Sequence, residues 1–147
     1  MKIRMLAAVA VGIIATTASA DDAAVKKELE KFTGSWQAVA VEHDGKQAPE
    51  EQVKTVKLTV RGDRYTLQMG EQVIEGTHKL DPSKDPKQID AIRSKGPDAG
   101  KTIRGIYILD ALTFKVCFAP VEKDHPTAFA TKEGDGQRLL IFKRVRP

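Results

Sequence analysis

Three histidines are the residues of this chain whose side chains could bind a metal ion. His43, His78 and His125 qualify by type, because imidazole nitrogens and thiolate sulfurs are the usual zinc ligands. None of them stands at metal-ligand spacing from another histidine or from Cys117, the single cysteine. The sequence therefore predicts no metal site.

His78 differs from the other two because it shares one face of an alternating segment with Ile74 and Leu80. Tyr65 and Tyr107 also fall on faces that the alternation turns inward. A buried phenol or imidazole needs a hydrogen-bond partner, which either the wall or a bound molecule can supply. We therefore name Tyr65, His78 and Tyr107 as candidate ligand-binding residues. The alternative is that they are hydrogen-bonded groups of a filled core.

Catalytic groups do not stand out in the sequence. Ser35, Ser83 and Ser94 fall in expected turns or loops, and the chain has neither a nucleophile elbow nor a phosphate-binding glycine loop. Four carboxylates that could do acid–base work lie in surface-type segments: Glu50, Glu51, Asp81 and Asp85. We therefore expect a protein that is not an enzyme and that uses no cofactor.

Basic side chains gather in sequence around two expected loops, at Lys84, Lys87, Arg93, Lys95, Lys101 and Arg104. No aromatic residues are interleaved with them, and the net charge of the whole chain is only +4. Nucleic acid is therefore not an expected partner. A mildly basic loop face could instead meet an anionic envelope surface.

The N-terminus has the pattern of a signal peptide. Lys2 and Arg4 precede an apolar run, and Ala18-Ser19-Ala20 then forms a small-residue cleavage motif. The run is too short for a membrane span of about 20 residues. We expect residues 1–20 to be removed after Ala20 and residues 21–147 to act as one exported domain, periplasmic or extracellular. That domain has 22 basic and 20 acidic residues. Its lone thiol, Cys117, is expected to be sheltered and unpaired.

Apolar periodicity predicts a helix over 22–32 and then a chain dominated by strands. The period-two segments are 36–41, 56–61, 65–69, 74–80, 88–92, 103–109, 112–118, 127–131 and 138–145. Pro49 and the acids after it predict a short helix to about Lys54, following the first strand. Hairpin-length connections favour antiparallel strands that close on themselves, because closure removes exposed edges. We predict an all-β, up-and-down barrel of about 8–9 strands, with a sandwich as the alternative.

The alternation assigns side chains to the two faces of the barrel wall. The expected inner face holds Trp36, Ala38, Ala40, Leu58, Leu67, Met69, Ile74, Gly76, Ala91, Gly105, Leu109, Phe114, Val116, Phe118, Phe129 and Phe142. Cys117 falls on the outer face, where another segment such as the N-terminal helix would cover it. The small residues of the inner face indicate either an open pocket or interdigitated packing.

Several motifs resemble a known family. Gly34-Ser35-Trp36 matches the Gly-x-Trp of lipocalin-like barrels, and the blocks 105–110, 112–120, 125–129 and 139–144 resemble the planctomycete family of small exported lipocalin-like domains of uncharacterised function. The resemblance covers about residues 29–144. It implies the barrel fold and a structural role for Gly34 and Trp36. It also implies that a basic residue of the last strand, Lys143 or Arg144, stacks on Trp36.

Two functions remain open at this point. The first is a binding domain, expected to be monomeric, that holds a small apolar or amphipathic ligand in the barrel. The second is a domain with a filled core that binds a protein or envelope surface through its loops. The volume of any cavity inside the barrel distinguishes the two functions, because ligand pockets have volumes of about 300 Å³ or more.

Overall fold

The structure is a computed structural model that describes residues 20–146 of the 147-residue chain. The expected signal peptide, residues 1–20, lies outside the described residues except for Ala20, which begins the first helix. Its cleavage stays a prediction.

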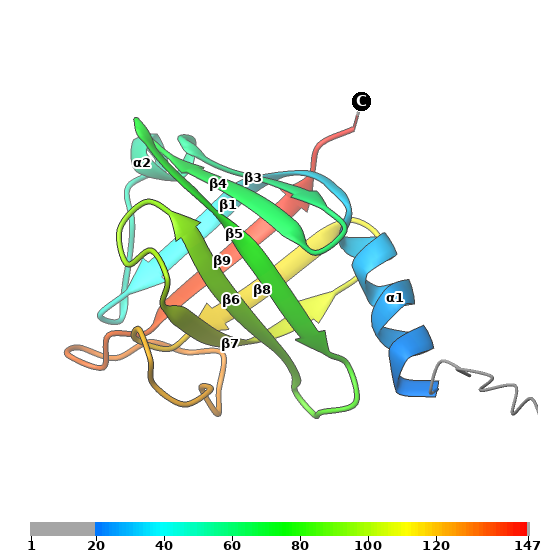
Figure 1. Cartoon of the computed structure of the whole chain (residues 1–147). Coiled ribbons are helices and arrows are strands. Elements are labelled where there is room, and N and C mark those ends of the chain that lie inside the picture. Colours follow the sequence, from blue (N-terminus) through cyan, green and yellow to red (C-terminus); the bar gives the residue numbers. More distant parts are fainter. Residues whose placement is uncertain (1–19, 147) are drawn as a thin grey trace, which may run out of the picture.

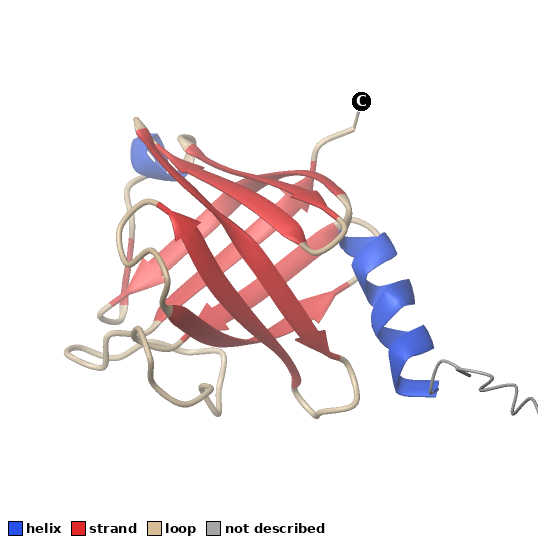
Figure 2. Cartoon of the chain, viewed as in Figure 1, coloured by secondary structure: helices blue, strands red, loops and turns tan. Residues whose placement is uncertain are grey.

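Eight antiparallel strands form a closed up-and-down barrel (Figures 1 and 2). They are β1 (Gly34–His43), β3 (Val56–Arg61), β4 (Arg64–Met69), β5 (Gln72–Asp81), β6 (Lys87–Lys95), β7 (Thr102–Leu109), β8 (Thr113–Phe118) and β9 (Arg138–Arg144). A further short strand, β2 (Lys46–Gln47), pairs with the end of β1. The barrel closes because β1 pairs with β9 as well as with β3. The barrel prediction is therefore confirmed, and the sandwich alternative is wrong.

Two helices accompany the barrel. The first, α1 (Ala20–Phe32), lies across one end of it (Figure 1). The second, α2 (Glu50–Val53), follows β2 and begins after Pro49, whose missing N–H is no loss at a helix start. Both helices lie where the sequence predicts them, within two residues.

One predicted strand does not exist. Residues 127–131 belong to an irregular loop that connects β8 to β9 over residues 119–137. Because β8 and β9 pair directly with each other, no edge is left there for an additional strand. Phe129 consequently lies outside the barrel against Ile106, Cys117 and Leu139, and not on the inner face as predicted.

A bulge in β1 makes the predicted inward position of Ala40 wrong. The pairing of β1 with β9 shifts between Ala38 and Ala40, which adds one residue to β1. Beyond the bulge the alternation is offset, so Val41 is buried and Val39 is 48% exposed. Val41 therefore takes the inner position that strict alternation gives to Ala40.

Cys117 is on the outer face of β8 and is fully buried, as predicted. Its cover is the 119–137 loop and not the N-terminal helix, since the thiol lies 3.6 Å from the Ala130 carbonyl oxygen and 3.8 Å from Gln137 Oε1. Burial raises the pKa of the Cys117 thiol, which favours its protonated form at pH 7.

Candidate ligand-binding site

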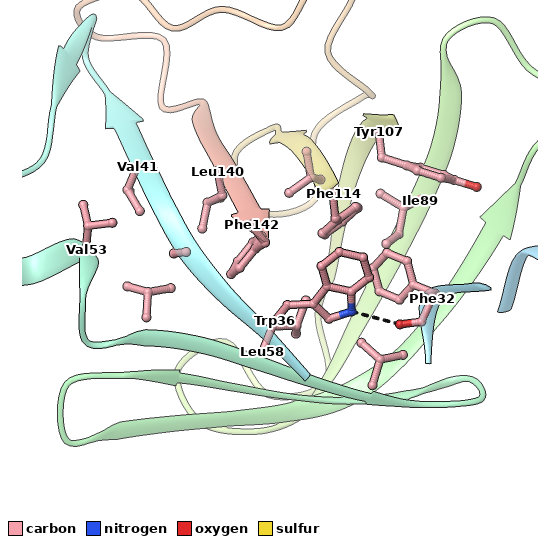
Figure 3. Packing of buried hydrophobic residues seen from close by; sticks show 14 of the residues in the cluster. Phe32, Trp36, Val41, Val53, Leu58, Ile89, Tyr107, Phe114, Leu140 and Phe142 are labelled. Carbon is pink, nitrogen blue, oxygen red and sulfur yellow. Dashed lines mark hydrogen bonds between the residues drawn. The ribbon is translucent and has the colours of Figure 1, made fainter. Parts of the chain in front are cut away.

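Aromatic side chains close the end of the barrel on which α1 lies. Phe32 and Trp36 are each 1% exposed, and the Trp36 indole N–H donates to the Phe32 carbonyl oxygen over 3.0 Å (Figure 3). Phe114 meets the Phe32 ring edge-on at 4.4 Å between centroids. The last residue of α1 thus packs with Trp36 and Phe114 into an aromatic floor at this end of the barrel.

Arg144 fixes the junction between α1 and the barrel. Its guanidinium stacks on Trp36, 4.2 Å from the ring centre, and donates to the carbonyl oxygens of Lys31, Thr33 and Ala111. The basic residue over Trp36 is therefore Arg144, while Lys143 points outward. A side chain at Gly34 would place its Cβ 2.5 Å from Arg144 Nη1, and φ there is +139°. Glycine at position 34 is needed for both reasons.

A buried carboxylate ties α1 to the barrel wall. Glu28 is 4% exposed; it accepts a hydrogen bond from Lys87 Nζ at 2.9 Å and one from the Tyr107 hydroxyl at 3.1 Å. Burial, and then the Glu28 charge, raise the pKa of Tyr107 well above its usual range. In Figure 3 the Tyr107 hydroxyl points away from the other labelled rings. Tyr107 is thus a structural partner of Glu28.

A cavity occupies the barrel interior above this floor. Its volume is about 100 Å³, and fourteen of its eighteen lining residues are aliphatic or aromatic. The four others are Tyr65, His78, Arg93 and Arg138. The volume is below the ~300 Å³ that is usual for ligand pockets, and somewhat below the ~150 Å³ of an engineered apolar cavity that binds benzene. The interior is therefore neither filled nor large.

Tyr65 and His78 form the polar side of the cavity wall. Their rings stack with centroids 6.1 Å apart, and His78 Nε2 lies 3.1 Å from the Gly62 carbonyl oxygen. Burial lowers the pKa of His78 and raises that of Tyr65, so both are neutral at pH 7. Nδ1 of His78 has no hydrogen-bond partner within residues 20–146. The wall can thus offer a neutral imidazole nitrogen.

The two arginines lie at the other end of the barrel from α1. Lys87, which contacts α1, begins β6, and Arg93 lies six residues further along that strand. Arg144, which also contacts α1, ends β9, whereas Arg138 begins it. The cavity therefore runs from an aromatic floor to a cationic mouth.

A surface hollow adjoins the cavity at this mouth. It has a volume of about 380 Å³, and Val41, Met69 and Arg138 line both spaces. Its other walls come from His43, Gln52, Thr55, Val56, Gly70 and Gln72. An apolar compartment inside the barrel and a more polar one outside it thus meet at Arg138.

The structure brings together two of the three candidate ligand-binding residues. Tyr65 and His78 line the cavity, but Tyr107 does not. Sequence reasoning missed Arg93 and Arg138, although each continues a period-two series, after Ile89 and Ala91 in β6 and before Leu140 and Phe142 in β9. It also missed Glu28, because a charged residue inside an amphipathic helix is normally read as solvated.

Other kinds of site are not found in the part of the chain that the structure describes. Within it, no three or more His, Cys, Asp or Glu side chains lie close enough together to hold a metal ion. None of the helices in that part is long and apolar enough to cross a membrane. Comparison with models of protein families, with curated proteins and with solved structures finds no match.

Proposed function

We propose that this protein is a non-enzymatic, exported binding domain that holds the apolar part of a small amphipathic molecule inside its barrel. One observation carries the proposal: an apolar-walled cavity shares Val41, Met69 and Arg138 with a more polar surface hollow at the end of the barrel away from α1. Such a site suits a ligand with two unlike ends. The resemblance to the planctomycete lipocalin-like domains, a family of uncharacterised function, concerns the barrel fold. A monomer in the periplasm or outside the cell is the form we propose.

The cavity volume limits the apolar part of the ligand. A space of about 100 Å³ accepts an apolar group no larger than about a benzene ring, or part of a thin alkyl chain, unless side chains move. Each buried methylene contributes about 0.8 kcal/mol, so affinity from the cavity alone is modest. Octan-1-ol is therefore a suitable probe, because its chain is thin and it carries no charge.

The test is titration of octan-1-ol while the backbone amide signals are followed by NMR. The expected shifts are at cavity residues such as Ile89, Ala91 and Leu140. Ala91→Leu fills the cavity and should abolish these shifts while leaving the protein folded. Ala128→Leu, the same change at an exposed loop position, is the matched control and should bind as the unaltered protein does.

The second candidate is a domain with a filled core that binds an envelope protein through its loops. The observation that favours it is the cavity volume itself, which is about a third of the usual lower limit. Native mass spectrometry of the protein purified from its own envelope separates the two. A co-purifying small molecule supports the binding domain, whereas a bound protein together with no response to octan-1-ol supports the loop-binding domain.

A further inference from the structure

The ionic side chains that line the cavity and the hollow have one sign. Among the described residues that line either space there is no aspartate or glutamate, whereas Arg93 and Arg138 are both present. His43 also lines the hollow, but its Nδ1 faces Asp44 at 3.3 Å, so it does not add a free positive group. The mouth of the barrel therefore presents guanidinium groups without an equal number of carboxylates.

The two guanidinium groups are held differently. Arg93 has a side chain only 16% exposed and donates to the Pro97 carbonyl oxygen at 2.8 Å, with Asp98 Oδ2 at 3.5 Å. These contacts partly neutralise it and fix its position. The Arg138 side chain makes no hydrogen bond or ion pair within residues 20–146, and the residue is exposed. Arg138 is therefore the guanidinium that is free to bind a ligand, and Arg93 adds a fixed positive potential behind it.

We propose that the ligand of this site is an amphipathic acid, whose headgroup pairs with Arg138 while its apolar chain enters the barrel. This inference rests on the proposed function and specifies the class of its ligand. The planar fork of an arginine matches a carboxylate with two parallel hydrogen bonds, and such charged hydrogen bonds are stronger than neutral ones. Arg138 stands between the two spaces, so a headgroup bound to it lies in the hollow while the chain points toward His78 and the floor.

The uncharged members of the hollow fit the same arrangement. Gln52, Thr55 and Gln72 carry amide or hydroxyl groups, and none of these three has an ionic charge that would oppose an anion. The cavity beyond Arg138 is apolar apart from Tyr65, His78 and Arg93, and it cannot stabilise a headgroup cation. A cationic amphiphile would meet two guanidinium groups at the mouth and be repelled.

The experiment compares three eight-carbon probes that differ only in headgroup: octanoate, octan-1-ol and octyltrimethylammonium. Affinities are measured by NMR titration of the full exported chain at low salt. Octanoate is expected to bind about tenfold more tightly than octan-1-ol, as for the gain of one charged hydrogen-bonded pair. Octyltrimethylammonium is expected to bind more weakly than octan-1-ol. Added salt should reduce the preference for octanoate, because it screens exposed charges.

Three variants locate the effect. Arg138→Gln should make octanoate and octan-1-ol bind equally, and Arg138→Lys should retain part of the preference because it keeps the charge without the fork. Arg61→Gln changes the net charge by the same amount at an exposed residue outside both spaces, and it should leave the preference intact. Arg138 is exposed and unpartnered, so folding of the variants is expected and is checked by thermal unfolding.

The outcomes distinguish the two proposals. If octan-1-ol binds as tightly as octanoate, the acid is the wrong ligand class. If Arg138→Gln preserves the preference for octanoate, Arg138 is not the group that binds the headgroup, and the proposal is overturned at that residue. A binding barrel survives both results. If octyltrimethylammonium binds best, the sign of the headgroup is wrong. If none of the three probes shifts the amide signals of the cavity residues, the proposed binding function and the proposed acid ligand are both wrong.

Discussion

The two ends of the barrel use their polar groups in opposite ways. At the α1 end, Glu28 has Lys87 and Tyr107 as partners, and Arg144 donates to three carbonyl oxygens. At the other end, Arg138 makes no such contact within the described residues. Groups whose hydrogen bonds are complete hold a structure together, whereas an exposed group without partners can bind something else. This contrast supports our proposal that the α1 end is structural and that the other end binds the ligand.

Trp36→Ala should have the largest effect, because it removes the ring at the centre of the closed end. The free energy of unfolding should fall by about 3–5 kcal/mol, as for other large-to-small core changes. Urea denaturation measures this. Val39→Ala, on the same strand but 48% exposed, should change little. A loss below about 1 kcal/mol for Trp36→Ala would contradict the structural role of this end.

Glu28→Gln should cost less, about 1–3 kcal/mol. The glutamine oxygen can still accept from Tyr107, but Lys87 loses its ionic partner at a half-buried site. Glu30→Gln is the control, since Glu30 lies on the same helix and is exposed. Equal stabilities of the two variants in urea would show that the Glu28 contacts do not hold α1 on the barrel.

His78 should make stability depend on pH. Burial lowers its pKa in the folded state, while in the unfolded chain the pKa is near 6.5. Below about pH 6.5 the unfolded state therefore binds a proton that the folded state does not. The free energy of unfolding consequently decreases as the pH is lowered. His78→Gln should flatten this part of the profile, measured between about pH 7.5 and about pH 5. His43→Gln, at the exposed last residue of β1, is the control substitution, and an unaltered slope in His78→Gln would disprove the assignment.

Arg138→Gln should have the smallest effect on stability, within about 0.5 kcal/mol, because the exposed side chain makes no hydrogen bond or ion pair within the described residues. Arg144→Gln is the sharpest comparison, since it makes the same change at the other end of β9 and removes three hydrogen bonds and the stacking on Trp36. Thermal unfolding of both variants tests the contrast directly. Similar losses at the two positions would remove the distinction between the two ends.

Much of the fold could be predicted from the sequence, because period-two alternation and turn residues are local signals. Ile74, His78 and Leu80 lie on the buried face of β5 as the alternation indicates. The same local signal failed at 127–131, where an alternating segment lies outside a barrel that is already closed. It also failed beyond Ala38, since a bulge depends on the pairing of β1 with β9.

Only part of the candidate site could be predicted from the sequence. Tyr65 and His78 followed from alternation, and Arg93 and Arg138 were equally readable as inward residues at the ends of β6 and β9. The alternation also predicted that Tyr107 points inward, but it could not predict that Tyr107 lies outside the cavity lining. Its hydroxyl is bonded to Glu28, a residue 79 positions away on a helix that crosses the end of the barrel.

The sequence by itself determined which residues alternate, where the chain turns, and therefore the antiparallel class of the fold. Only the tertiary structure decided which end is closed, how much space remains inside, and which charges are left without partners. The physical reason is that alternation depends on neighbours along one strand. Cavity volume and charge pairing depend on side chains from strands far apart in the chain, such as Arg93 and Arg138, which line one cavity only when the barrel has closed.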